Sequence, residues 1–148
     1  MRGRIMVAYS FHEQFVDAIT SGTKRQTVRG YRRRNPRIGE KLQLFANLRK
    51  RTCRKLIEKD PICTRVDEIE IEISPEKAAK IASIVINGIP LNQKEIEDFA
   101  HADGFKNGPL GWTAVHAMGS FFKRHHGFGT FHGVVIHWRL SEQWEPAE

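Results

Sequence analysis

The sequence has few cysteines, no long apolar run and no recognisable leader. Cys53 and Cys63 are its only cysteines, so no disulfide framework is expected. We expect a reduced intracellular protein. No apolar stretch approaches the ~18 residues of a membrane-spanning helix. Segment 1–9 lacks the cleavage site of a signal peptide. We therefore expect a cytoplasmic protein without a membrane partner, in which both cysteines serve as packing residues.

The short motifs that mark metal and nucleotide sites are also missing. HExxH, paired CxxC, the P-loop, GxGxxG and GxSxG do not occur, and the seven histidines do not fall at zinc spacing. We therefore predict no metal and no cofactor. His125 and His126 are expected at an exposed helix end, where protonation suits the helix dipole.

Length and composition are those of an ordinary globular chain. It has 148 residues, of which 40% are hydrophobic and 28% charged. This length suits one compact domain and is short for two. We expect a single domain over 1–148, with 141–148 as a loose polar tail.

Positive charge is concentrated in one stretch of the chain. Segment 23–55 contains thirteen Lys and Arg and a single acid, Glu40, which gives +12; because the whole chain is +7, the remainder carries −5. A basic surface of this kind attracts polyanions such as RNA. The alternative is a solvated basic loop around Arg32, Arg33 and Arg34.

Hydrophobic periodicity predicts six or seven strands and three helices. The expected strands are 4–9, 25–29, 40–46, 52–57, 69–73, 81–86 and 131–138. Asn87-Gly88 is a strong hairpin-turn signal. Because the links between strands are short, a curled antiparallel or mixed sheet is favoured over a doubly wound fold. The predicted class is α+β, mainly β.

Capping residues predict where the helices begin and end. Ser10 with Glu13 suggests a capping box for the first helix, and Gly22 suggests its left-handed end. Asn92 suggests the start of the second helix, and Asp103 its end. The third helix is expected to show one apolar face, formed by Trp112, Val115, Gly119 and Phe122. Four aromatic residues are expected in the core: Trp112, Phe121, Phe122 and Trp138.

Two groups of residues could carry chemistry. In Gly22-x-Lys24-x-x-Thr27-x-Arg29, a strand places Thr27 and Arg29 on one face. A partly desolvated Lys24 could act as a base, Thr27 as a nucleophile, and Arg29 could bind phosphate. The alternative is a surface lysine and an ordinary strand threonine. Asp103 stands at the unfavourable end of a helix dipole, so it would need a nearby cation; the alternative is a simple turn.

These residues resemble the signature of the ASCH domain, a member of the PUA-like superfamily. The resemblance is carried by Phe15-x-x-x-Ile19-x-x-Gly22-x-Lys24-x-x-Thr27-x-Arg29 and by Ile38-Gly39-Glu40-Lys41-Leu42. It continues in Arg51-Thr52-Cys53-Arg54-Lys55-Leu56, as in short bacterial and phage members. Asp103-Gly104-Phe105, Phe121-Phe122 and the segment 131–138 resemble the closing half, so that residues 4–139 are covered.

The resemblance implies a small PUA-like β-barrel of about six strands with about three helices packed around it. It also implies a cleft beside the GxKxxTxR strand that binds RNA or a modified nucleotide. Together with the charge pattern, the residues expected to bind phosphate or ligand are Gly22, Arg29, Arg32, Arg33 and Arg34. In the branch that deacetylates acetylcytidine, the catalytic positions fall on Lys24, Thr27 and Asp103. Asp103 is ~1.5 Å shorter than that branch's Glu.

Three functions therefore remain open from the sequence. Binding of RNA or a nucleotide is favoured. An amidohydrolase that removes an acyl group from a modified cytidine is the first alternative, with Lys24, Thr27 and Asp103 as its catalytic set. A ribonuclease is the second alternative, in which charged groups would stabilise the phosphorane.

Overall fold

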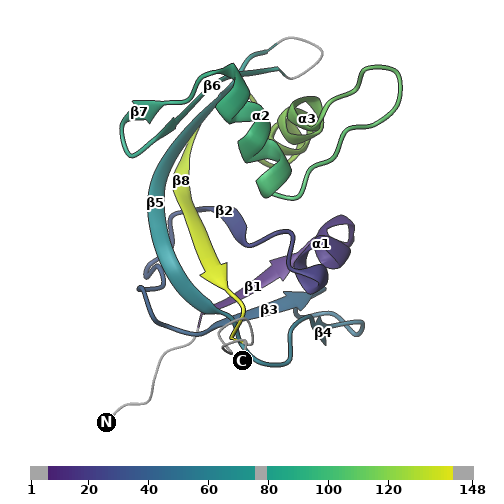
Figure 1. Ribbon diagram of the computed structural model, residues 1–148, viewed down its shortest axis with the longest axis vertical. Helices are drawn as coiled ribbons and strands as arrows, with labels where there is room; N and C mark the ends of the chain where they lie inside the picture. The colour runs from purple at the N-terminus through teal and green to yellow at the C-terminus, as the bar shows by residue number, and fades with distance from the viewer. Residues whose placement is uncertain (1–6, 76–79, 142–148) are drawn as a thin grey trace, which may run out of the picture. The chain divides into compact units, whose positions relative to one another are not determined.

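The computed structural model describes residues 7–75 and 80–141. Within these ranges the chain is α+β and mainly β, with three α-helices and strands in two sheets (Figure 1). The strands are β1 (Val7–Phe11), β2 (Gln26–Gly30), β3 (Leu42–Ala46), β4 (Arg54–Lys55), β5 (Ile62–Ile73), β6 (Ile81–Ile86), β7 (Ile89–Pro90) and β8 (Gly129–Arg139). The helices are α1 (Val16–Ser21), α2 (Gln93–Ala102) and α3 (Ala114–His126), with a 3-10 turn, η1 (Glu13–Phe15), before α1.

One sheet has the order β1-β3-β4 and the other the order β2-β8-β5-β6-β7. Each of the seven predicted strand segments overlaps an observed strand, with residues 4–6 of the first segment outside the described residues, and the predicted α+β, mainly β class is confirmed. The described strands form these two sheets and no closed barrel. No helix in the described part of the chain is long and apolar enough to cross a membrane.

The chain divides into two compact units, each made of segments that are discontinuous in sequence. The first unit comprises Met1–Gln26, Arg32–Val66 and Ile136–Glu148, and the second comprises Thr27–Tyr31 and Asp67–Val135. The predicted tail lies outside the described residues from 142 onward. Its first residue, Ser141, donates a hydrogen bond from Oγ to the carbonyl of Asp60 at 3.1 Å.

Buried side chains of β1 and β3 form much of the core of the first unit. These strands run parallel, with Val7 opposite Leu42 and Phe11 opposite Ala46. Alternate residues of each strand are buried, because successive side chains point to opposite faces. The buried set is Val7, Tyr9, Phe11, Leu42, Leu44 and Ala46, with Phe15, Ala18 and Ile19 from η1 and α1.

The predicted start of the first helix is wrong, whereas its predicted end is confirmed. Ser10 lies in β1, and its Oγ accepts a hydrogen bond from the backbone N–H of Leu48 at 3.1 Å. Pairing with β3 continues through Phe11 and therefore holds Ser10 extended. η1 begins after His12, whose side chain makes no capping bond. Gly22 ends α1 with φ of 85°, as a left-handed C-cap.

The second unit contains the clearest strand pattern. In β5, the buried Ile69, Ile71 and Ile73 alternate with exposed glutamates, and each buried isoleucine contributes ~1.5–3 kcal/mol. β5 pairs antiparallel with β6. The turn into β7 is at Asn87 and Gly88, whose φ values of 51° and 81° are both positive, as a type I′ hairpin turn requires. The predicted hairpin is confirmed.

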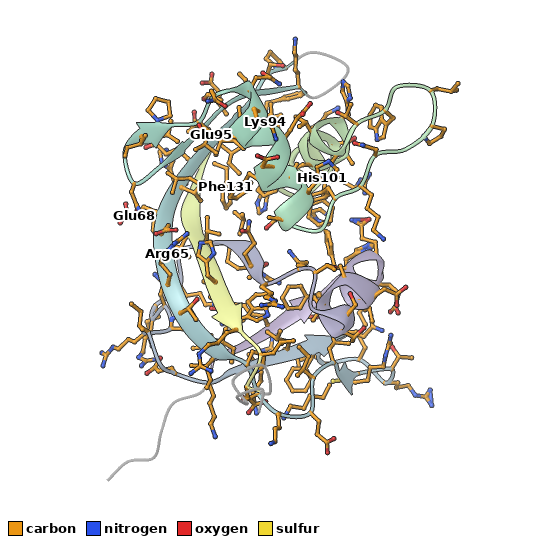
Figure 2. All side chains as sticks on the ribbon, in the orientation of Figure 1. Arg65, Glu68, Lys94, Glu95, His101 and Phe131 are labelled. Carbon is orange, nitrogen blue, oxygen red and sulfur yellow. The ribbon has the colours of Figure 1, made fainter. Side chains whose placement is uncertain are left out.

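Helices α2 and α3 lie side by side in the second unit (Figure 1). Asn92 forms the predicted cap of α2, as part of a capping box with Glu95. The buried side of α2 consists of Ile96, Phe99 and Ala100, whereas Lys94, Glu95 and His101 project from its exposed side (Figure 2).

The predicted apolar face of the third helix is only partly right. α3 begins after Thr113, which caps it together with His116. Trp112 therefore precedes the helix; it is 40% exposed and stacks on His116. Phe122 and Gly119 are buried as predicted, together with Ala114 and Met118.

The packing predictions for the remaining aromatic and cysteine residues had mixed outcomes. Trp138 is 3% exposed, so its predicted place in the core is confirmed, and Phe121 is half-buried. Cys63 is buried as predicted. Cys53 is exposed, because it lies in the loop before β4 and outside both sheets.

Candidate functional site

Most cations of the basic segment, residues 23–55, lie on the surface. Lys24 is buried and Arg29 and Arg34 are half-buried, whereas the other ten are exposed. The exposed cations are Arg25, Arg32, Arg33, Arg37, Lys41, Arg49, Lys50, Arg51, Arg54 and Lys55. All of these belong to the first unit. This unit therefore presents a strongly positive surface.

The three consecutive arginines of the loop between β2 and β3 have different environments. Arg32 places its guanidinium over the ring of Tyr9, 4.4 Å from the centroid, and donates from Nη2 to the carbonyl of Ala8 at 3.2 Å. Arg33 is exposed. Arg34 forms an ion pair with Glu40. Arg32 and Arg33 are thus available at the surface, whereas Arg34 holds the loop together.

Glu40 links its end of the loop between β2 and β3 to Arg34 and Arg37, which lie earlier in the same loop. Its carboxylate accepts hydrogen bonds from the Arg34 side chain and, at 2.8 Å, from the backbone N–H of Arg37. These bonds hold the pKa of Glu40 below its usual range, the Arg34 bond having the larger effect. The one acid of the basic segment therefore organises the loop that carries Arg32 and Arg33.

The second basic loop joins β3 to β4 and carries Arg49, Lys50 and Arg51. Its path includes two left-handed residues, Asn47 at φ 55° and Arg49 at φ 72°. The ion pair of Arg54 with Glu13 connects its far end to η1 at 2.7 Å. The same contact lowers the pKa of Glu13 and raises that of Arg54. Among the described residues, no ion pair includes Arg49, Lys50 or Arg51.

Lys24 is 2% exposed and lies just beyond the C-terminus of α1. Its Nζ donates to the carbonyl of Gln26 at 2.7 Å and lies 4.9 Å from the ring centroid of Phe15 and 5.8 Å from that of Phe11. Carbonyl oxygens and aromatic faces both stabilise an ammonium group. Sequence reasoning placed Lys24 beside a strand, but its enclosure by two phenylalanines depends on tertiary packing.

Gly22, predicted to contact the ligand, is buried at the end of α1. Its φ of 85° favours glycine, and a Cβ there would lie 3.3 Å from Leu140 Cδ1. In the described structure its role is to turn the chain from α1 toward Lys24.

Thr27 and Arg29 lie in the second unit, on β2. As the strand pattern predicted, they share a face: Arg29 Nε donates to Thr27 Oγ1 at 3.1 Å. Thr27 is 5% exposed, and Arg29 is half-buried. A guanidinium that donates to a hydroxyl oxygen withdraws electron density from it and leaves the hydroxyl hydrogen free to point elsewhere.

Asp103 is the C-cap of α2 in the second unit, so the predicted helix end is confirmed. Its backbone N–H bonds to the carbonyl of Phe99, and its side chain is nine-tenths buried, at 5% exposure. Asp103 therefore lies in the turn that ends α2, with its side chain buried. The third predicted catalytic residue, like Lys24 and Thr27, is thus a buried polar side chain.

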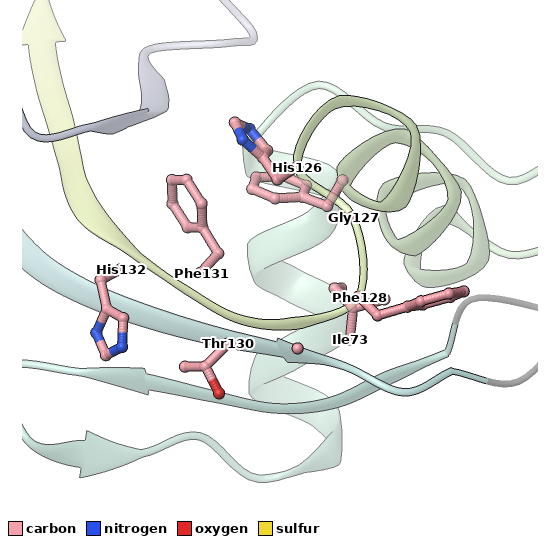
Figure 3. A pocket seen from close by; sticks show the side chains of 9 residues that line it. Ile73, His126, Gly127, Phe128, Thr130, Phe131 and His132 are labelled. Carbon is pink, nitrogen blue, oxygen red and sulfur yellow. The ribbon is translucent and has the colours of Figure 1, made fainter.

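Sequence reasoning missed a pocket where α3 meets β8 in the second unit (Figure 3). We call it the α3–β8 pocket; it measures about 350 Å³ and is lined by Ile73, Phe122 and His126 to His132. From the sequence, His125-His126 are predicted at a helix end and Phe122 in the core, and no pattern predicts a pocket that joins them. Both histidines do lie exposed at the end of α3.

Among the described residues, no group of three or more His, Cys, Asp or Glu side chains is arranged to hold a metal ion.

No known protein family, curated protein or solved structure matches this chain.

Proposed function

We propose that this protein binds RNA or a phosphate-bearing nucleotide through the basic segment of the first unit. The observation that carries the proposal is the placement of Arg32, whose guanidinium is exposed yet fixed over Tyr9 and bonded to Ala8. A cation that is already ordered loses little side-chain entropy when it binds a phosphate. Planar guanidinium groups also match phosphate oxygens in pairs.

The surrounding charges support the same proposal. Arg33 follows Arg32 on the same loop, and Arg49, Lys50 and Arg51 lie exposed on the second basic loop. Such residues contribute affinity by displacing counterions from the nucleic acid, which makes binding depend steeply on salt. The ASCH resemblance supports an RNA or nucleotide ligand on separate grounds, since it rests on the GxKxxTxR residues.

The proposal also includes the more detailed expectations that follow from the resemblance to the ASCH domain. They are a PUA-like barrel of about six strands, a single domain, a cytoplasmic location and a ligand cleft beside the strand that carries Thr27 and Arg29. Gly22 and Arg34 have structural contacts in their loops, so we assign direct phosphate contact to Arg32 and Arg33.

The test is a titration of labelled single-stranded RNA with the full chain at several salt concentrations. The double variant Arg32→Glu/Arg33→Glu should lose most of its affinity and show a shallower salt dependence, by about 0.7 in slope for each phosphate contact removed. Lys59→Glu is the matched control, because Lys59 is an exposed cation outside the basic segment. An RNA affinity that changes neither with salt concentration nor in the double variant would refute the proposal.

A second candidate is an amidohydrolase acting on an N-acylated cytidine. It is favoured by one observation: Lys24, Thr27 and Asp103, which the resemblance identifies as catalytic, are each buried polar side chains. Thr27 Oγ1 would attack the acyl carbonyl while Lys24 takes the hydroxyl proton. The amide C–N bond would then break as this proton passes to the cytidine amine, and water would hydrolyse the acyl-threonine to release the acid. Against this role, Lys24 Nζ already donates a hydrogen bond to the carbonyl of Gln26 and lies 4.9 Å from the ring centroid of Phe15, so its side chain is engaged by the protein itself. Binding is therefore the better supported function.

Release of acetate from acetylcytidine tests the second candidate. The wild type should release acetate, and Thr27→Val and Lys24→Met should not, whereas Thr64→Val, which alters an exposed threonine on β5, should remain active. A wild type without activity, or an active Thr27→Val, rejects hydrolysis. Cleavage of RNA that is lost in Lys24→Met would instead assign the ribonuclease alternative.

A further inference from the structure

The α3–β8 pocket has the size and lining of a site for a small planar molecule. Its volume of about 350 Å³ falls within the ~300–1,000 Å³ of ordinary ligand pockets. It lies wholly within the second unit, whereas the exposed cations of the basic segment belong to the first unit. Its lining is rich in rings, from Phe122 and His126 on α3 and from Phe128, Phe131 and His132 beyond it.

Three of these rings contact one another and form one wall of the pocket. His126 lies 4.5 Å from Phe131 and 5.4 Å from Phe122, measured between ring centroids, and Phe122 lies 5.4 Å from Phe131. Figure 3 shows the rings of His126 and Phe131 side by side, with Thr130 and His132 on the opposite side of β8. Phe131 is also labelled on β8 in Figure 2.

Phe128 is an exposed phenylalanine of the pocket. It follows Gly127 at the end of α3 and is 53% exposed. Lys123 Nζ lies over this ring, 5.1 Å from its centroid. An aromatic side chain that stays half in water beside a cation resembles the stacking positions of proteins that bind single-stranded nucleic acid.

The charges around the pocket suit a phosphate on the α3 side. The last turn of α3 carries Lys123, Arg124, His125 and His126. On the β8 side, His132 Nδ1 lies 3.7 Å from Glu70, so any charge on this imidazole is offset by a carboxylate. A phosphate would therefore lie near Lys123 and Arg124 rather than near His132.

His126 is suited to contact an uncharged ring. Partial burial lowers its pKa, and the neighbouring His125 lowers it further. A lowered pKa favours the uncharged imidazole, which offers a flat face together with one donor and one acceptor nitrogen.

We propose that the α3–β8 pocket binds the base of an unpaired nucleotide, which stacks on Phe128 while its phosphate contacts Lys123 and Arg124. This goes beyond the proposed function, which concerns the first unit. A free nucleotide and a nucleotide within single-stranded RNA share this chemistry, and the experiment distinguishes the two sources.

The experiment titrates the full chain with adenosine monophosphate in one arm and with a short single-stranded RNA in the other. Phe128→Ala should weaken binding about 5- to 150-fold, the range expected for loss of one base stack. Lys123→Ala should weaken it as well, and because this variant leaves every ring in place, it keeps the test informative if Phe128→Ala unfolds. The ring resonances of His126 should shift when the ligand is added.

Two controls alter similar residues of the second unit outside the pocket. Ile89→Ala removes an exposed apolar side chain, and Lys106→Ala removes an exposed cation. Both should bind like the wild type. Mononucleotide binding that Phe128→Ala and Lys123→Ala weaken identifies a free nucleotide as the pocket's ligand, and an effect of these variants in the RNA arm alone identifies a nucleotide within a strand. No binding in either arm, or equal affinity of Phe128→Ala, Lys123→Ala and wild type, overturns the inference.

The outcome is independent of the proposed function. If Arg32→Glu/Arg33→Glu weakens RNA binding while Phe128→Ala and Lys123→Ala do not, the proposed function stands and the pocket inference fails. If the pocket variants weaken mononucleotide binding while the arginine variant changes nothing, the inference stands and the proposed function fails.

Discussion

Arg29 donates a hydrogen bond from Nε to Thr27 Oγ1 at 3.1 Å, across one face of β2. Two residues apart on an extended strand, these side chains point to the same side. Thr27 is β-branched and therefore stiff at χ1, so the bond fixes the direction of its hydroxyl. Whatever this face of the strand contacts, it presents a guanidinium and a hydroxyl in a fixed arrangement.

Thr27→Val should lower the free energy of unfolding by about 1 kcal/mol. Valine keeps the shape of threonine but removes the oxygen that Arg29 Nε bonds, and a polar group that loses its partner costs ~1–3 kcal/mol. The half-buried position of Arg29 places the loss near the lower end. Urea unfolding measures it. The control Thr64→Val should change stability by less than ~0.5 kcal/mol; equal effects of the two variants would show that the bond contributes nothing.

Gly133→Ala should destabilise the protein strongly. A Cβ at Gly133 would lie 2.2 Å from the carbonyl oxygen of Arg29 and 2.9 Å from the ring of Phe131. Because the nearest atom is backbone, β2 and β8 would have to separate there, and overpacking of this kind costs ~1–3 kcal/mol or more. Thermal unfolding measures the loss.

Gly30→Ala is the matched control for this prediction. Gly30 lies on β2, and a Cβ there would meet nothing within 4 Å. Its melting temperature should stay close to that of the wild type. A Gly133→Ala protein as stable as Gly30→Ala would contradict the close approach of β8 to Arg29.

Acid should open the loop between β2 and β3. The Arg34 and Arg37 hydrogen bonds lower the pKa of Glu40 in the folded chain. The carboxylate therefore stabilises the fold fully above its unfolded pKa of about 4.3, and this contribution is lost as the pH falls through the lower folded pKa. Carboxyl chemical shifts should show Glu40 titrating below the usual range, and the amide of Arg37 should exchange faster once it does.

Glu40→Gln should remove this acid-dependent step and weaken binding of RNA by loosening the loop that carries Arg32 and Arg33. Glu58→Gln, at an exposed position outside the basic segment, should leave both unchanged. An amide of Arg37 that exchanges at the same rate in wild type and Glu40→Gln would show that the carboxylate does not close the loop.

The two cysteines should react with thiol reagents at very different rates. Cys63 is 1% exposed and burial raises its pKa, so little reactive thiolate forms, whereas Cys53 is exposed. The native chain should take up one equivalent quickly and the second only on unfolding. Cys53→Ser should abolish the fast phase; a fast phase that persists would place Cys63 at the surface.

Local patterns were enough to predict several elements correctly. The alternation of Ile69, Ile71 and Ile73 predicted a half-buried strand, and Asn92 and the Asn87-Gly88 turn predicted a helix start and a hairpin. In each case the decisive interactions join residues close in the sequence: a cap three residues away, a two-residue turn, or a period of two along one strand.

Features that depend on distant residues were predicted wrongly or missed. Ser10 looked like a helix cap, but the pairing of β1 with β3, which is far away in the sequence, made it a strand residue. The difference between Arg32 and Arg34 depends on Tyr9 and Glu40 as partners. The α3–β8 pocket combines Ile73 of β5 with Phe122 of α3 and with residues 126–132, which are about fifty or more positions later in the sequence.

By itself, the amino-acid order determined the α+β, mainly β class, most element positions and the concentration of positive charge in one segment. Only the tertiary structure decided which arginine is held over a ring and which is paired to a carboxylate. It also decided that Lys24 is enclosed by Phe11 and Phe15 and that rings from α3 and β8 line a pocket. The physical reason is range: propensity and periodicity act over a few residues, whereas burial and charge pairing depend on which distant segments pack together.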